Sequence, residues 1–298
     1  MQLTYKCYPC ILDDLEGALT LLATDDKTAR AVMEEAATLM AREGPDRKPP
    51  SYYITRVHRM LKKATGIEEP FAELRAKTNR IGVDLAKRIR KETGEMSPAE
   101  KFRLRVMWCV ASNHLDFRTV GTGYGFNPGV IYSNLEKQVE KGLALDMVGE
   151  LRQCASKVGK VLYIHDNVGE VAVDTVLIEE LRNMGAHVVS ALRGGPITSD
   201  ATMDDGRAAG VFEAADEVIL AGPDTLGIAL DEMTDQLAEH LESADLVVSK
   251  GQANYYVLTE YIKKHDGRFA FLFSSKCDPV AEKFGLKGIN NLVWLYES

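Results

Sequence analysis

The chain has 298 residues, of which 45% are hydrophobic and 27% are charged, and this balance is typical of a folded globular protein rather than a disordered or fibrous one. The formal net charge of -8 argues against a protein that binds nucleic acid or an anionic membrane, because both partners require basic surface. Residues 1–150 carry 23 basic and 21 acidic side chains, whereas residues 151–298 carry 13 and 23. An anionic ligand bound in the second half therefore needs a cation or nearby basic side chains to offset the field.

The sequence also bears on the cellular compartment and the number of domains. No apolar run approaches the length of a membrane span, and the first residues lack the basic and apolar segments of a secretion signal. Five cysteines are too few and too scattered for a disulfide framework. We therefore expect a cytoplasmic protein with one large domain or two unequal ones.

The first third of the chain has the pattern of helices. From Ile11 to about Leu115 apolar residues recur at three- and four-residue steps, which predicts about five helices. Caps and breaks punctuate them at Thr24-Asp25-Asp26, Gly44-Pro45, Pro49-Pro50, Thr93-Gly94 and Ser97-Pro98. These signals predict a helical region over residues 1–118, followed by a glycine-rich connection at 119–132.

After a predicted helix near 133–156, short β-branched runs alternate with helical stretches. The runs are Lys160–Ile164, His187–Leu192, Glu217–Leu220, Asp245–Ser249, Phe269–Phe273 and Asn291–Leu295. Because they are apolar on both faces, they predict buried parallel strands, and helices at roughly 171–184, 226–242, 252–264 and 278–285 supply the crossovers. The expected fold class is α/β, with a doubly wound, mostly parallel sheet of the Rossmann-like α/β/α kind over residues 133–298.

Polar side chains follow the predicted strands at the edge where such sheets bind ligands. Asp166 and Asn167 follow the first strand, Asp200 follows the second, and Lys250 and Lys276 follow the fourth and fifth. Two carboxylates and an amide are oxygen donors that suit Mg²⁺ or Mn²⁺ better than zinc, and lysines can hold phosphate oxygens. The alternative is that the two aspartates only cap the following helices. The convergence of four strand ends favours a site.

These strand-end motifs occur in a fixed order with others. The set is Cys7-x-x-Cys10, Ser112-Asn113-His114-Leu115-Asp116-Phe117, Asp166-Asn167-Val168-Gly169-Glu170, Arg193-Gly194-Gly195-Pro196 with Ser199-Asp200-Ala201-Thr202, Lys250-Gly251-Gln252-Ala253-Asn254-Tyr255, and Lys276-Cys277. Over essentially the whole chain this combination resembles the DUF89 family, the metal-dependent damage-control phosphatases of the ARMT1-like fold. The cysteine pair is similar to that of the prokaryotic subgroup.

The resemblance implies roles for individual residues. It implies that the divalent metal is bound by Asp166, Asn167 and Asp200. It implies a phosphate pocket lined by Lys250, Gly251, Asn254 and Lys276, with a further contribution from Asn113 and Asp116. This sequence departs from the family pattern at His114, Leu115, Arg118 and Val168, and the first three bear on how the substrate fits.

The implied reaction is hydrolysis of a small phosphomonoester, a sugar phosphate or a damaged phosphometabolite, by water that is activated by Mg²⁺, Mn²⁺, Co²⁺ or Ni²⁺. Asp166 or Asp200 acting as general base or nucleophile is the catalytic alternative. The sequence lacks the second aspartate of haloacid-dehalogenase phosphatases, which favours metal-activated water. Two other functions stay open: an S-adenosylmethionine-dependent carboxyl methyltransferase, although no Gly-x-Gly-x-x-Gly follows the first strand, and a non-catalytic sugar-phosphate-binding protein.

Four further residues have more than one interpretation. Glu170 either supports the metal ligands from behind or is an acid favoured by the helix dipole, and Arg193 either clamps phosphate or pairs with a carboxylate. Cys7 and Cys10 have zinc-like spacing, but one pair is only half of a structural zinc site. They are otherwise buried thiols, and a redox role requires a lowered thiol pKa.

Overall fold

The computed structural model describes residues 1–118 and 128–297. Most of the predicted glycine-rich connection at 119–132 lies outside these residues, and its last part is already the start of helix α6. None of the helices in the described ranges is both long and apolar enough to cross a membrane.

The described part of the chain forms one seven-stranded sheet with the order β1-β7-β6-β5-β2-β3-β4. The strands are β1 (Leu145–Asp146), β2 (Lys160–Ile164), β3 (His187–Arg193), β4 (Glu217–Gly222), β5 (Leu246–Lys250), β6 (Arg268–Ser275) and β7 (Asn290–Glu297). Every neighbouring pair is parallel except β6 and β7. The predicted α/β class with a mostly parallel sheet is confirmed.

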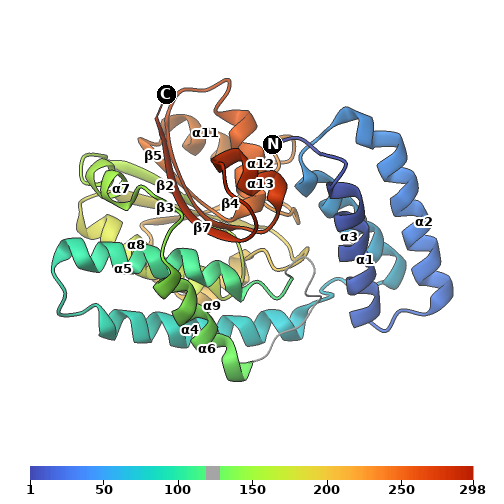
Figure 1. Ribbon diagram of the computed structural model, residues 1–298, viewed down its shortest axis with the longest axis horizontal. Coiled ribbons are helices and arrows are strands. Elements are labelled where there is room, and N and C mark those ends of the chain that lie inside the picture. The colour runs from blue at the N-terminus through green and yellow to red at the C-terminus, as the bar shows by residue number, and fades with distance from the viewer. Residues whose placement is uncertain (119–127, 298) are drawn as a thin grey trace.

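Helices cover both faces of this sheet (Figure 1). In chain order they are α1 (Cys7–Leu21), α2 (Asp26–Glu43), α3 (Pro50–Thr65), α4 (Ala72–Glu92), α5 (Pro98–Ala111), α6 (Pro128–Lys141), α7 (Val148–Ala155), α8 (Glu170–Asn183), α9 (Met203–Ala209), α10 (Val211–Ala214), α11 (Asp235–Ser243), α12 (Gln252–Tyr261) and α13 (Asp278–Ala281), with short 3-10 turns at Gly44–Asp46, Ser112–Leu115 and Glu282–Phe284. Alternate strand residues explain the layering, because Val161 and Tyr163 pack with α4–α8 whereas Leu162 and Ile164 pack with α11–α13.

The N-terminal helices divide between two hydrophobic cores. Helices α1–α3, drawn in blue in Figure 1, pack on one another around Leu15, Val32 and Val57. Helices α4 and α5 instead contribute Leu85 and Phe102 to the core beneath the sheet. The predicted boundary at residue 118 therefore does not coincide with the division between these cores.

Three predicted elements differ from the structure. The run at 291–295 was expected to be a parallel strand, but β7 is antiparallel to β6. The segment between these strands contains only α13 and a 3-10 turn, which is too short to carry the chain back for a parallel crossover. The helix predicted near 133–156 is broken into α6, β1 and α7.

The third difference lies beside the strand ends. The helix predicted at 226–242 begins only at Asp235, where the Thr234 side chain accepts a hydrogen bond from the backbone N–H of Leu237 and so caps it. Residues 223–234 form a loop instead. This loop reaches the candidate site, as described below.

Candidate active site

The backbone brings the three predicted metal ligands to one place at the carboxyl edge of the sheet. The turn after β2 carries Asp166 and Asn167, and Asn167 forms an isolated antiparallel bridge with Asp200. The N–H of Ala201 donates to the carbonyl oxygen of Asp166 at 2.7 Å, and the N–H of Val168 donates to Ser199 at 2.8 Å. Two segments from different strands are thus joined by a short ladder.

Two carboxamides tie Asp166 to Glu170. Asn113 Nδ2 donates to Asp166 Oδ2 at 3.0 Å and to Glu170 Oε2 at 2.9 Å. Asn167 Nδ2 donates to the same two oxygens, to Asp166 Oδ2 at 2.6 Å and to Glu170 Oε2 at 3.0 Å. Burial, reinforced by the carboxylates of Glu170 and Asp200, holds the pKa of Asp166 well above its usual range. Glu170 therefore contacts a predicted metal ligand through shared amides, which favours the first of its two interpretations.

Asp200 is fully buried and has one oxygen available. Its Oδ2 accepts the N–H of Gly227 at 2.6 Å and lies 3.4 Å from the guanidinium of Arg193. Among the described residues its Oδ1 has no hydrogen-bond partner. Burial raises the pKa of Asp200, against the opposing effect of Arg193. A buried carboxylate oxygen without a partner is costly unless a ligand meets it.

Lys250 does not face this site as the sequence suggested. The side chain is fully buried, and its ammonium donates to Glu170 Oε1 at 2.5 Å, Asp174 Oδ1 at 2.7 Å and the carbonyl of Cys109 at 2.9 Å. An ammonium has three donors, so none is left for a phosphate. Although burial disfavours the charge, Asp174 and Glu170 raise the pKa of Lys250.

Asn254 and Gly251 also hold the site together. Asn254 Oδ1 accepts from Arg193 at 2.8 Å and from the N–H of Ile228 at 2.9 Å. Its Nδ2 donates to the carbonyl oxygens of His165 and Lys250 at 3.0 Å and 2.8 Å. The hydrogen-bonding groups of both residues are thus engaged within the protein, since the N–H of Gly251 donates to the carbonyl oxygen of Leu272.

Gly251 approaches the Asp166 carboxylate more closely than a side chain permits. Its backbone has φ +77° and ψ 160°, and a Cβ built there would lie 1.9 Å from the Asp166 carboxylate. This backbone region is open essentially only to glycine. Gly251 is thus required for the close approach of β5 to the turn after β2.

A cavity of about 310 Å³ opens in front of these groups. Its polar lining includes Asp116, Asp166, Asn167 and Lys276, and Lys276 forms a partly buried ion pair with Asp116. Burial alone would lower the pKa of Lys276, but the carboxylates of Asp116 and Asp166 raise it above its usual value. Lys276 is therefore a charged donor that lines the cavity, unlike Lys250.

The lining of the cavity also includes thiols. Cys7, Cys10 and Cys277 all line it, and all three are free thiols. Burial raises the pKa of Cys10 to about 11 and also raises that of Cys277, which opposes the lowered pKa that a redox role needs. Within the described residues no group of three His, Cys, Asp or Glu side chains could hold a metal ion, so the half zinc site at Cys7 and Cys10 is not completed.

The order of these motifs has its counterpart in known proteins. The model of the damage-control phosphatase ARMT1-like domain matches residues 3–292. The chain belongs to this family. A damage-control phosphatase of Archaeoglobus fulgidus is 31% identical over 286 residues, which are 96% of this chain and 96% of the relative.

A relative from Pyrococcus horikoshii agrees with this family membership in both sequence and structure. A damage-control phosphatase of Pyrococcus horikoshii is 30% identical over 284 residues, covering 95% of this chain and 94% of the relative. The crystal structure of a DUF89 family protein from Pyrococcus horikoshii superposes with a TM-score of 0.86 at 29% identity, covering 98% of each chain. The predicted resemblance to the DUF89 family is confirmed along the whole fold.

The residues of this family member fit a hard divalent ion. Asp166 and Asp200 supply carboxylates and Asn167 an amide, and oxygen is the donor that Mg²⁺ and Mn²⁺ prefer. The Asp200 oxygen without a partner and the disfavoured charge of Asp166 are both conditions that a bound cation relieves. Because its third member is the amide of Asn167, this set is different from the groups of three His, Cys, Asp or Glu side chains considered above.

Two contributors to the site had no place in the sequence prediction. Asp174 holds Lys250 and also His165, whose Nδ1 lies 2.9 Å from Asp174 Oδ2. Its signal was an acid inside the otherwise apolar run of α8, four residues after Glu170. Gly227, which donates to Asp200, lies in the loop that the sequence predicted as helix.

Proposed function

We propose that this protein is a metal-dependent phosphatase that hydrolyses small phosphomonoesters, sugar phosphates or damaged phosphometabolites. The main support is the meeting of Asp166, Asn167 and Asp200 at one edge of the sheet, where Asp166 and Asn167 line a cavity together with the charged side chain of Lys276. The names of the relatives from Archaeoglobus and Pyrococcus agree with phosphate ester hydrolysis. The cavity volume of about 310 Å³ is at the small end for ligand pockets.

In this proposal Asp166, Asn167 and Asp200 hold the divalent ion, which is Mg²⁺, Mn²⁺, Co²⁺ or Ni²⁺. Such an ion, when bound, activates water for in-line attack and draws charge from the phosphoryl oxygens. Lys276 binds the phosphate through its ammonium and stabilises the charge that builds up on the phosphoryl oxygens. Asp116, paired with Lys276, keeps that ammonium charged and oriented.

The surrounding residues orient the proposed ligands and balance charge behind them. Asn113 and Asn167 donate to the same oxygen of Asp166, which leaves the other oxygen for the cation. Lys250 offsets part of the negative charge of Glu170 and Asp174 behind the site. Without Lys250, the negative charge behind Asp166 would repel an incoming phosphate.

A methyltransferase has less support. A Rossmann-type cofactor binds at the first strand–helix turn, which corresponds here to the turn between β2 and α8. Helix α4 covers this turn so closely that a Cβ at Gly82 would lie 2.0 Å from the carbonyl oxygen of Gly169. The turn therefore has no room for a nucleotide.

Phosphate release from a panel of phosphomonoesters tests the proposal. The purified chain is assayed with Mg²⁺, Mn²⁺, Co²⁺ or Ni²⁺, and again after chelation. We expect release that chelation abolishes and that Asp200→Asn reduces by at least about 100-fold, as for loss of a metal ligand or its partner. Asp204→Asn, a change at an exposed acid nearby in α9, is the matched control.

Three results would contradict the proposal. Absence of release with every metal favours the non-catalytic phosphate-binding protein. Full activity after chelation would show that hydrolysis does not require a metal ion. Binding of S-adenosylmethionine, measured by calorimetry, without any phosphate release would favour the methyltransferase hypothesis.

A further inference from the structure

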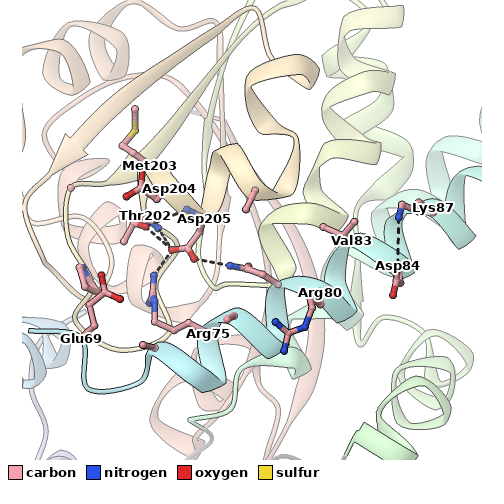
Figure 2. Close-up of a pocket in the computed structure, with 16 residues that line it drawn as sticks. Glu69, Arg75, Arg80, Val83, Asp84, Lys87, Thr202, Met203, Asp204 and Asp205 are labelled. Atoms are coloured by element: carbon pink, nitrogen blue, oxygen red, sulfur yellow. Dashed lines mark hydrogen bonds and ion pairs between the residues drawn. The ribbon is translucent and has the colours of Figure 1, made fainter.

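A second polar cavity, of about 670 Å³, lies on the outer side of α4, between that helix and α9 (Figure 2). Its lining shares no described residue with the substrate cavity. In Figure 2 the side chain of Arg75 points toward Asp205, whereas Arg80 lies farther along the same helix and points away. The floor of this cavity is a buried hydrogen-bond network that no proposed step has used.

The centre of the network is the carboxylate of Asp205. Its Oδ1 accepts from Asn79 Nδ2 at 2.6 Å, and its Oδ2 accepts from the guanidinium of Arg75. The same Oδ2 accepts the N–H and the hydroxyl of Thr202, at 2.8 Å and 2.6 Å. Asp205 therefore fixes both α4 side chains and caps α9, which directly follows the Asp200 segment.

Arg75 and Asn79 use their remaining atoms on the two segments that carry the proposed metal ligands. Arg75 Nη1 donates to the carbonyl oxygen of Thr198 at 2.7 Å and to that of Asp200 at 2.9 Å. Asn79 Oδ1 accepts the N–H of Gly169 at 2.8 Å. Helix α4 thus binds the segment of Asp200 through Arg75. It binds the segment of Asp166 and Asn167 through Asn79, one helical turn away.

These contacts are buried and closely packed. Arg75 is 5% exposed and Asn79 is 9% exposed. A Cβ at Gly169 would lie 2.6 Å from the carbonyl oxygen of Thr78, so α4 and the turn meet backbone to backbone. A guanidinium is planar and presents its donors in a fixed fork, which suits it to hold two carbonyls and a carboxylate at once. Lysine has no such fork.

We infer that Arg75, Asn79 and Asp205 are positioning residues for the metal site, which set the separation between Asp200 and the Asp166–Asn167 pair from outside the substrate cavity. This inference rests on the proposed function for the identity of the metal ligands. The three residues touch neither metal nor substrate. They act by holding backbone atoms.

The test compares Arg75→Lys with Arg80→Lys on the full chain. Both keep the charge, both change a residue of α4 that lines the outer cavity, and Arg80 is exposed. Titration calorimetry with Mn²⁺ alone should give a dissociation constant about 10- to 100-fold weaker for Arg75→Lys and unchanged for Arg80→Lys. Hydrogen exchange of the metal-free proteins should rise at the amides of Gly169 and Ala201 only in Arg75→Lys.

Phosphate release adds a signature that separates positioning from catalysis. Arg75→Lys should need more Mn²⁺ for half-maximal activity but recover most of the wild-type rate at saturation. Asn79→Ala, which removes the contact to Gly169, is the second variant and should weaken Mn²⁺ in the same direction. If Arg75→Lys does not fold, the Mn²⁺ affinity of Asn79→Ala alone tests the inference.

The outcomes separate this inference from the proposed function. Wild-type Mn²⁺ affinity in folded Arg75→Lys and Asn79→Ala overturns the inference even if the protein hydrolyses phosphomonoesters. Equal weakening in Arg80→Lys also overturns it, because an exposed α4 arginine outside the hydrogen-bond network would then have the same effect. Weaker Mn²⁺ binding in a protein that hydrolyses no ester supports the positioning role and refutes the phosphatase.

Discussion

Substitution of Gly251 by alanine perturbs the site through a single methyl group. A Cβ at this position lies 1.9 Å from the Asp166 carboxylate, whereas an ordinary contact begins at 3.4 Å. The carboxylate or the β5–α12 turn must therefore shift by about 1.5 Å, and a misplacement of about 1 Å can cost 100-fold in rate. We expect phosphate release by Gly251→Ala to fall by at least about 100-fold and Mn²⁺ binding to weaken.

Stability should change much less than activity. The backbone conformation of Gly251 strains any other residue by about 1–3 kcal/mol, which corresponds to a fall in Tm of about 2–10 °C in a chain of this size. Thermal unfolding followed by circular dichroism measures this fall, and calorimetry with Mn²⁺ measures the site. The two readouts separate backbone strain from the displacement of Asp166.

Gly285→Ala is the matched control. Gly285 also has a positive φ, of +70°, but a Cβ there meets no atom within 4 Å. It should lower Tm modestly and leave Mn²⁺ affinity and phosphate release unchanged. The reasoning is refuted if folded Gly251→Ala binds Mn²⁺ and releases phosphate as the wild type does, because the site would then tolerate a carboxylate displaced by more than an ångström.

Three further predictions concern the other groups around the site. Lys250→Met leaves Glu170 and Asp174 buried without their cation and should reduce the free energy of unfolding by about 3–5 kcal/mol, measured by urea titration. Lys276→Met removes the cavity-lining cation that pairs with Asp116 and should raise the KM for a phosphomonoester by about 10- to 100-fold, with a smaller change in kcat. Because burial raises the pKa of Cys10 to about 11, its alkylation at pH 7.5 should be slow and should accelerate about tenfold per pH unit up to that value, as peptide mass spectrometry can follow.

Each of these predictions has its own contrary result. Unchanged stability of Lys250→Met would mean that the two carboxylates are protonated or solvated without it. A purely kcat effect in Lys276→Met, with Lys287→Met at an exposed position as control, would assign Lys276 to a step after binding. Rapid alkylation of Cys10 at neutral pH would show a reactive thiol and reopen the redox interpretation.

The fold was largely accessible from the sequence because burial on both faces leaves a strong signal. The strand Lys160–Ile164 coincides with β2, and four of its five residues are fully buried. Parallel strands place their carboxyl ends at one edge, so the meeting of Asp166 and Asp200 followed from topology alone. The direction of β7 could not be predicted in this way, because it depends on the length of the preceding connection rather than on the strand's own residues.

The direction of side chains at the strand ends was less accessible. Lys250 and Lys276 both end strands, and nothing in the order of residues says which one enters the core and which one the cavity. The difference comes from their partners: Asp174 and Glu170 draw Lys250 inward, whereas Asp116 lies beside the cavity and pairs with Lys276. An acid inside the apolar run of α8 was the one advance sign of a buried counterion.

The hydrophobic core that contains α1–α3 has a consequence for how substrate preference can change. These helices supply Cys7, Cys10, Ile11 and Ile54 to the wall of the substrate cavity, while the proposed phosphate-binding groups belong to the sheet and to the segment after α5. The core of these helices also contains Phe117 and Val168, which adjoin Asp116 and Asn167. Under the proposed function, mutations at the cavity-lining positions of the first three helices would change which leaving group fits, whereas mutations in the shared core would also reach the loops that carry the proposed ligands.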